Sequence, residues 1–156
     1  MNRNFYDYTD YILKDVTERN SLWQGKDPVR PHLSSTFKSS EGRFVFGLYD
    51  SVKNDYAAFI CIAITKDVPK DEGELKMLTC KDGSIAVPYS VWSSKPGAGK
   101  VIVNRAIEFA AKEMGIQRVV TLSPRTGMAK RFHLKNNAKE VMVSDCFINF
   151  EYKVRD

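Results

Sequence analysis

The segment spanning residues 84–122 constrains the fold more than any other part of this 156-residue chain. Its first part, SIAVPYSVWS (84–93), is apolar and rich in β-branched and aromatic residues, which is typical of a strand. A glycine-containing loop follows, and apolar side chains then recur at helical spacing over 99–114 until Gly115, a residue type that commonly ends helices. The short apolar run 117–122 is a second strand, so the segment predicts a β-α-β crossover.

The flanking segments predict mainly antiparallel strands. Residues 43–49 and 56–65 lie on either side of the turn-forming sequence DSVKND, so they predict a hairpin. Residues 141–154 predict one long strand or a pair of strands. Pro88 cannot donate a ladder hydrogen bond inside the third strand, so it predicts an edge, a bulge or a break at that point.

Two further helices are expected. Near the N-terminus, aromatic and aliphatic residues recur at helical spacing, which predicts an amphipathic helix over residues 4–18. Pro124 is tolerated in the first turn of a helix and is expected to open the second one, with Met128 and Phe132 on its inner face.

The order of these elements predicts an α+β fold. The sheet is expected to be mixed but largely antiparallel, with one central β-α-β crossover over residues 84–122. The length suits a single domain over residues 1–156, in which residues 1–40 form an N-terminal helix and loop.

Composition excludes several classes of protein. No apolar run approaches the length of a membrane span and the N-terminus is too polar for a secretory signal, so we expect a cytoplasmic protein. The three cysteines form no C-x-x-C pair, which argues against a disulfide framework or a zinc site, and Cys61 and Cys146 are expected in the core. The net charge of +5 suits an anionic partner. Because Lys and Arg are dispersed, a phosphate-bearing cofactor is favoured over nucleic acid.

The loop WSSKPGAGK (92–100) has the composition of a phosphate-binding turn but fits neither common nucleotide motif. Gly99 and Lys100 match the G-K step of a P-loop, yet Ser94 replaces its first glycine and Val101 replaces its hydroxyl residue. The dinucleotide motif fails at its third glycine. A glycine loop that enters a helix nevertheless presents free amides and the positive end of the helix dipole to an anion. The same sequence also suits a plain glycine turn from strand to helix.

The order strand, glycine loop, helix and strand resembles the core of the GNAT superfamily of acyl-CoA enzymes. The usual loop of that superfamily is Q/R-x-x-G-x-G/A, and SKPGAG (94–99) keeps the glycines but changes the leading residue. Three segments also resemble the catalytic domain of malonyl-CoA decarboxylase, which is itself a GNAT fold. They are the YS pair before the loop (89–90), the TLSP segment with its following glycine (121–127) and the FHLKNNA segment (132–138). The resemblance covers roughly residues 28–150.

This resemblance implies roles for individual residues. The loop backbone of the superfamily holds the CoA pyrophosphate, so the expected cofactor-binding residues are Trp92, Ser93, Ser94, Lys95, Gly97, Ala98, Gly99 and Lys100. Ser123 and His133 match the catalytic serine and histidine of the decarboxylases. The malonyl carboxylate is expected near Ser123, and a protonated His133 is expected to deliver a proton to the enolate carbon once CO₂ has left. The resemblance requires no metal.

The sequence departs from the decarboxylases at two points, and other functions stay open. Only nine residues separate Ser123 from His133, where that family has a long helical insertion, and Val101 stands where it has an acid. One alternative is a GNAT N-acetyltransferase that moves an acyl group from acetyl-CoA to an amine, with Glu74 or Tyr152 as a conceivable base. A second alternative is an inactive module that binds CoA or nucleic acid. No membrane partner is expected, and the oligomeric state stays open.

Overall fold

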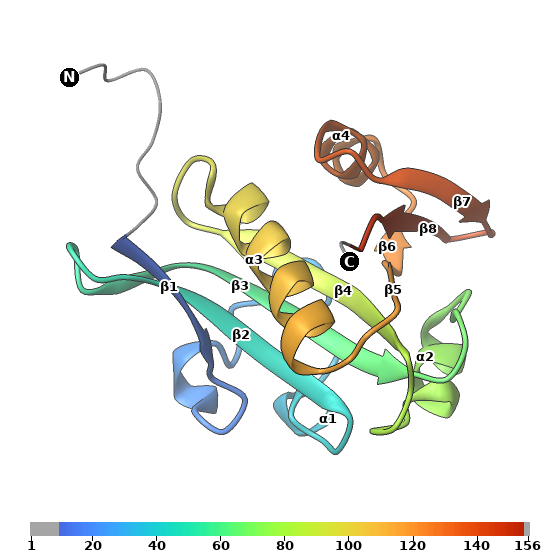
Figure 1. Cartoon of the computed structure of the whole chain (residues 1–156), viewed down its shortest axis with the longest axis horizontal. Helices are drawn as coiled ribbons and strands as arrows, with labels where there is room; N and C mark the ends of the chain where they lie inside the picture. The colour runs from blue at the N-terminus through green and yellow to red at the C-terminus, as the bar shows by residue number, and fades with distance from the viewer. Residues whose placement is uncertain (1–9, 155–156) are drawn as a thin grey trace.

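The computed structural model describes residues 10–154, which form one mixed sheet of eight strands with helices on both faces (Figure 1). The strands are β1 (Tyr11–Asp15), β2 (Arg43–Asp50), β3 (Asp55–Thr65), β4 (Ile85–Ser93), β5 (Arg118–Val120), β6 (Ser123–Pro124), β7 (Lys139–Val143) and β8 (Phe147–Tyr152). The helices are α1 (Ser35–Lys38), α2 (Glu72–Leu78), α3 (Ala98–Glu113), α4 (Gly127–Lys135) and the short 3-10 helix η2 (Asn20–Leu22).

The sheet is mixed and largely antiparallel with one β-α-β crossover, as the sequence predicts. Its order is β1-β2-β3-β4-β5-β8, and every neighbouring pair is antiparallel except β4 and β5, which α3 connects in parallel. β6 continues the line of β5 along one edge of β8, and β7 pairs with the other edge of β8. This is an α+β fold with one β-α-β crossover at its centre.

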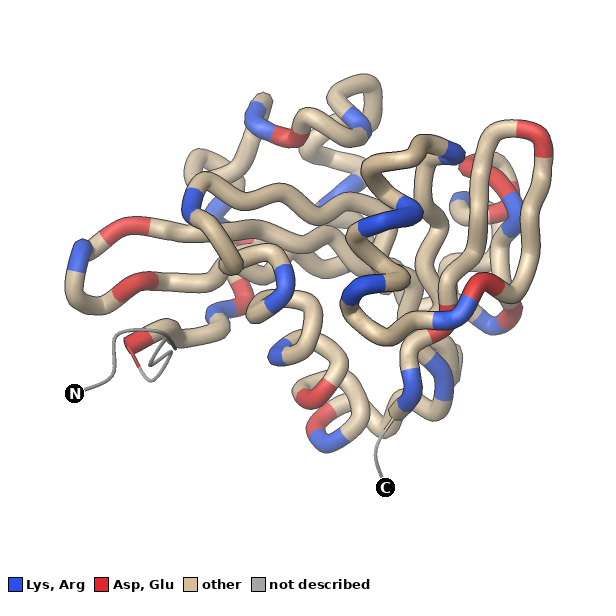
Figure 2. The backbone as a smooth tube through the Cα atoms, turned by 90° about the horizontal axis from the view of Figure 1, so that it is seen from above, with Lys and Arg blue, Asp and Glu red and all other residues tan. Residues whose placement is uncertain are grey.

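Two apolar cores lie on the two faces of the sheet. α3 covers one face, where Ile102 packs against strand residues such as Ile60 and Phe150. The other face is covered by the segment before β2 and by α2, which contribute Trp23 and Leu75. Within residues 10–154, no helix is both long and apolar enough to span a membrane. Lys and Arg are interspersed with Asp and Glu over the molecule (Figure 2).

The expected helix at residues 4–18 is wrong for the part that is described. Residues 4–9 lie outside the described residues, and Tyr11–Asp15 is strand β1, paired with β2 from Tyr11–Asp50 to Asp15–Phe46. The spacing of the apolar residues here fits a strand as well as a helix. As a strand, the segment places Tyr11 and Leu13 on the side of the sheet that α3 covers. Backbone pairing with the otherwise open edge of β2 outweighs the weak local helical preference.

Two expectations near the C-terminus are also corrected. Pro124 does not open a helix, because Ser123 and Pro124 pair with Ile148 and Phe147 as β6, and α4 begins only at Gly127. Residues 139–152 form a hairpin, the second of the two arrangements expected there. Cys146 lies in its turn and is exposed, so it is no core residue, whereas Cys61 is buried as expected.

Candidate active site

A cavity of about 590 Å³ lies where β4 and the chain that follows β5 diverge. The two strands pair in parallel only over 85–86 and 118–119, and the Leu122 N–H adds one hydrogen bond to the Pro88 carbonyl at 3.0 Å. Beyond Pro88, no backbone hydrogen bond joins β4 to β5 or β6 in the described part of the chain. α4 forms a further wall of this gap, so β4, β6 and α4 provide most of the cavity lining.

An irregularity of β4 shapes one side of the cavity, at the place that Pro88 predicts. Ile62 pairs with Pro88 and Cys61 pairs with Ser90, so Tyr89 is the extra residue of a β-bulge. The bulge places Pro88, Tyr89 and Ser90 in the cavity lining. The Tyr89 side chain is buried, and its burial raises the pKa of the phenol well above its usual value.

His133 projects from α4 into the cavity lining and is 7% exposed. Its Nδ1 atom lies 2.6 Å from the Tyr152 hydroxyl, and its ring stacks on Phe150 at a centroid distance of 5.1 Å. Burial lowers the pKa of His133 to about 4, so the ring is neutral at pH 7 in the free protein. The expectation of a protonated His133 is therefore corrected. When the Tyr152 hydroxyl donates to Nδ1, the imidazole carries its own proton on Nε2 and remains a hydrogen-bond donor.

Ser123 reaches the same cavity from β6. Its Oγ lies 2.8 Å from Oγ1 of Thr121, and that oxygen accepts the Phe150 N–H at 3.1 Å. Thr121 can thus donate its hydroxyl proton to Ser123, which leaves the Ser123 proton available to a group in the cavity. Ser123 is no helix cap, because the Thr126 side chain caps α4 by accepting the Ala129 N–H.

The glycine loop joins β4 to the start of α3 beside this cavity. Gly97 caps α3 with φ +78°, and the Ala98 N–H donates to the Lys95 carbonyl at 3.2 Å. The N–H groups of Gly99 and Lys100 have no acceptor among the described residues. Two adjacent free amides at the start of a sixteen-residue helix are the arrangement that favours a bound anion.

The predicted cofactor residues do not all lie together. Trp92, Ser93 and Gly99 line the cavity with Ser123 and His133. The other predicted cofactor residues lie outside its lining, and they are Ser94, Lys95, Gly97, Ala98 and Lys100. Lys95 is engaged in two ion pairs with aspartates, and Ala98 is buried in the core. Glu74, a conceivable base from sequence, accepts the Lys70 N–H next to α2 and does not line the cavity.

Replacing Gly97 with alanine is expected to lower the free energy of unfolding by about 1 kcal/mol, because a Cβ atom disfavours the left-handed backbone found there. Urea denaturation of the purified variant measures the change. Gly73→Ala is the matched control, since Gly73 lies inside α2 and alanine is the better helix former. A Gly97 variant as stable as the parent would contradict the left-handed turn.

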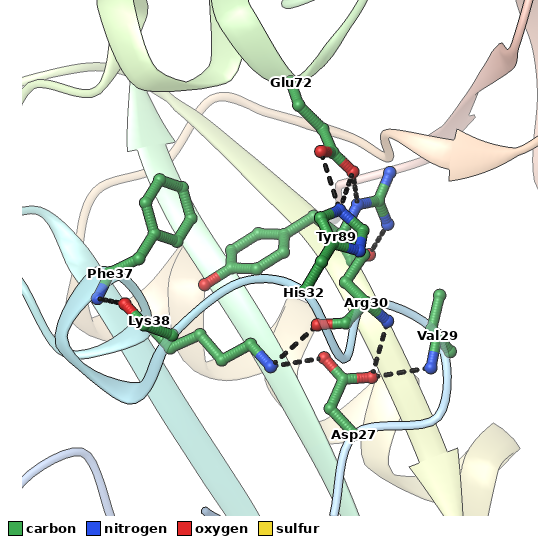
Figure 3. Close-up of polar contacts among 9 residues, drawn as sticks. Asp27, Val29, Arg30, His32, Phe37, Lys38, Glu72 and Tyr89 are labelled. Carbon is green, nitrogen blue, oxygen red and sulfur yellow. Dashed lines mark hydrogen bonds and ion pairs between the residues drawn. The ribbon is translucent and has the colours of Figure 1, made fainter. Parts of the chain in front are cut away.

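A buried network of charges fixes the N-terminal side of the cavity (Figure 3). Lys38 Nζ lies 2.8 Å from Asp27 Oδ2, and both side chains are at least 95% buried. Asp27 Oδ1 also accepts the N–H groups of Val29 and Arg30 at 2.8 and 3.0 Å. Burial alone would raise the pKa of Asp27, but the hydrogen bonds from Lys38 and the Arg30 amide outweigh it and lower the pKa. The segment that contains Pro28 and Val29 is thereby fixed as part of the cavity lining.

Arg30 links this segment to the bulge in β4. Its Nη1 donates to the Tyr89 carbonyl, and its Nε donates to Glu72 Oε2 at 2.8 Å (Figure 3). Glu72 also pairs with the exposed ring of His32 at 2.8 Å. Sequence reasoning did not identify this network. The one available signal is Asp27 ahead of a proline, where an aspartate commonly accepts the amides two and three residues on.

Comparison with known proteins identifies solved structures that share this fold. Neither a protein-family model nor a curated protein matches this chain. Among solved structures, malonyl-CoA decarboxylase from Agrobacterium vitis is similar with a TM-score of 0.58 and 18% identity, over 81% of this chain and 36% of that one. The chain thus spans about a third of the decarboxylase.

Other similar structures match over nearly their whole length. The loading GNATL domain of CurA from Lyngbya majuscula has a TM-score of 0.61 and 14% identity, over 92% of this chain and 98% of that one. Spermidine N-acetyltransferase from Vibrio cholerae, in complex with CoA and spermine, has a TM-score of 0.59 and 7% identity, over 92% and 93%. Together with the sheet order and the crossover, these likenesses show that the chain has the GNAT fold.

Proposed function

We propose that this chain is an enzyme that binds an acyl-CoA thioester and decarboxylates malonyl-CoA to acetyl-CoA in the cavity between β4, β6 and α4. The free amides of Gly99 and Lys100 would bind the CoA pyrophosphate at the start of α3. The acyl end would lie in the cavity that Ser123 and His133 line.

The observation that carries the reaction is the lack of charge in the cavity. Among the described residues, no Asp, Glu, Lys or Arg lines it, and its titratable side chains are His133 and Tyr89. Both are neutral at pH 7, because burial lowers the pKa of His133 to about 4 and raises that of Tyr89. A carboxylate that enters such a cavity loses its hydration, whereas CO₂ leaves without charge. The environment therefore favours loss of the carboxylate.

The bond between the carboxylate carbon and the α-carbon breaks, CO₂ departs, and the electron pair moves onto the thioester oxygen as an enolate. The Ser123 hydroxyl and the Nε2–H of neutral His133 are the donors assigned to this oxygen, where charge develops. The α-carbon then takes one proton that comes from solvent, so that malonyl-CoA and H⁺ become acetyl-CoA and CO₂.

Transfer of an acyl group to an amine is the second candidate. The structural likeness to N-acetyltransferases supports it, as does a neutral His133 beside Tyr152, because a neutral imidazole can accept a proton from an ammonium group. Removal of that proton and attack of the amine on the thioester carbon would release CoA.

The deciding experiment incubates the protein with malonyl-CoA and, separately, with acetyl-CoA, and follows thermal unfolding and product mass together. A thioester at 100 times its Kd is expected to stabilise the native state by about 2.7 kcal/mol. Conversion of malonyl-CoA to acetyl-CoA would support the decarboxylase. Stabilisation without conversion, followed by acetyl transfer when spermidine is added, would favour the second candidate. Absence of stabilisation by either thioester would contradict both.

A further inference from the structure

Lys95 lies in the glycine loop, but its side chain points to the β2–β3 hairpin. Its Nζ is 2.8 Å from Asp50 Oδ2 and 2.6 Å from Asp55 Oδ1. Asp50 and Asp55 are the last residue of β2 and the first residue of β3. The three residues form a contact, which we call the Lys95 latch, between the hairpin and the loop that precedes α3.

The carboxylate that receives Lys95 is itself fixed. Asp50 Oδ1 accepts the N–H groups of Val52 and Lys53 at 3.0 and 3.1 Å, so the hairpin turn orients this side chain while Oδ2 holds the ammonium. The hydrogen bonds to Asp50 and Asp55 raise the pKa of Lys95, and the hydrogen bond from Lys95 lowers the pKa of Asp50. Lys95 and Asp50 are therefore charged at pH 7.

The backbone of Lys95 carries this restraint to α3. Its carbonyl accepts the N–H of Ala98, the first residue of the helix, at 3.2 Å. On the other side, the Ser94 N–H donates to the Ala57 carbonyl of β3 at 2.9 Å. One residue is thus bound to the hairpin through its side chain and to the helix start through its backbone. The next two residues of α3 are Gly99 and Lys100, whose N–H groups have no acceptor among the described residues.

We propose that Lys95 is a positioning residue: it binds the hairpin aspartates and thereby holds the amides of Gly99 and Lys100 in place for the CoA pyrophosphate, without contacting the phosphate. The inference rests on the proposed binding of CoA. It also replaces the expectation that Lys95 is itself a cofactor-binding residue.

The sign of one substitution distinguishes this proposal from simple charge attraction. Asp50 and Asp55 carry two negative charges against the one positive charge of Lys95, so the latch has a net charge of −1. If charge alone mattered, Asp50→Asn would make the site more positive and strengthen the binding of anionic CoA. If the latch positions the loop, the same substitution weakens binding.

The experiment measures the Kd of CoA by calorimetry for the wild type, Asp50→Asn, Lys95→Met and the double variant. We expect Lys95→Met to raise the Kd about tenfold, and Asp50→Asn, which leaves the contact with Asp55, to raise it by less. The variant that combines Asp50→Asn with Lys95→Met should bind no more weakly than Lys95→Met, because the contact with Asp50 is already lost. Lys95→Arg keeps a donor for both carboxylates and is expected to retain most of the affinity. Asp82→Asn, at the far end of β4, is the control for the loss of one negative charge and should leave the Kd unchanged.

Two results would overturn the proposal. Tighter binding by Asp50→Asn together with weaker binding by Lys95→Met would show that Lys95 acts on the phosphate as a charge. Unchanged binding by both variants would show that the loop needs no latch. A wild-type protein that binds no CoA would instead overturn the proposed function and the latch with it. Unfolding transitions without ligand identify any variant that weakens binding because it is unfolded.

Discussion

Replacing Lys38 with methionine is expected to lower the free energy of unfolding by about 3–5 kcal/mol, because it leaves the buried Asp27 carboxylate without its opposite charge. Asp27 also accepts hydrogen bonds from two backbone N–H groups, but these do not supply the positive charge of the Lys38 ammonium group 2.8 Å away. Urea denaturation at pH 7 measures the loss. The double variant Asp27→Asn with Lys38→Met removes both charges and is expected to regain part of the stability.

Lys81→Met is the matched control for this experiment. Lys81 pairs with Glu41 at 3.5 Å, but both side chains are mostly exposed, and such pairs contribute between 0 and about 1 kcal/mol. A loss below about 1 kcal/mol in Lys38→Met would mean that water reaches Asp27, and the buried network would not fix the wall of the cavity.

Replacing His133 with glutamine is expected to lower kcat/KM for malonyl-CoA by a factor of about 10²–10³, the usual contribution of one positioned hydrogen-bond donor to a developing oxyanion. The wild-type rate should be constant across neutral pH, because the pKa of His133 is about 4 and the ring does not change its charge in that range. Steady-state kinetics between pH 4.5 and pH 9, values chosen to bracket the usual histidine pKa of about 6.5, test both statements.

A protonated His133 would give the opposite profile, with a rate that falls as the pH rises through about 6.5. Tyr152→Phe is the companion variant: it removes the hydroxyl 2.6 Å from Nδ1 while the ring and its packing remain. Tyr152→Phe should lower kcat/KM by a smaller factor than His133→Gln, because it retains the imidazole. An unchanged rate in His133→Gln would remove this residue from the mechanism.

The same histidine links stability to pH. Its pKa is lowered from 6.5 to about 4 on folding, so the unfolded chain binds the proton more tightly than the folded chain. The contribution of the neutral ring to stability is therefore fully present above pH 6.5 and is lost between about pH 6.5 and pH 4. In His133→Gln this part of the pH dependence should disappear.

The parts of the fold that could be predicted are those with local signals. The crossover over 84–122 combines strand composition, a glycine loop and a helical repeat in one continuous stretch, and all three describe the same structure. Pro88 marked the bulge because the chemistry of proline alone excludes a regular ladder there. β1 could not be recognised, since its apolar spacing also fits a helix and only the edge of β2 selects the strand.

In the candidate site, too, the features with a local sequence signal could be predicted, and those set by tertiary contacts could not. The segments with Ser123 and His133 were found through a resemblance of short motifs, and the folded chain brings both side chains to one cavity. The protonation state of His133 was missed because it depends on burial against Phe150 and Tyr152, which the sequence does not place beside it. The pairing of Asp27 with Lys38 and of Arg30 with Glu72 joins residues whose partners are set only by tertiary structure.

The walls of the cavity come from Gly99 and from three stretches of the chain, 28–29, 88–93 and 123–133. No fragment that lacks one of them can form the cavity, so it appears only when nearly the whole chain has folded. A ligand in the cavity would therefore stabilise the N-terminal and C-terminal segments together, as one cooperative unit. A molecule bound there should slow proteolysis near residue 28 and near residue 130 to the same extent, although about a hundred residues separate the two cleavage regions.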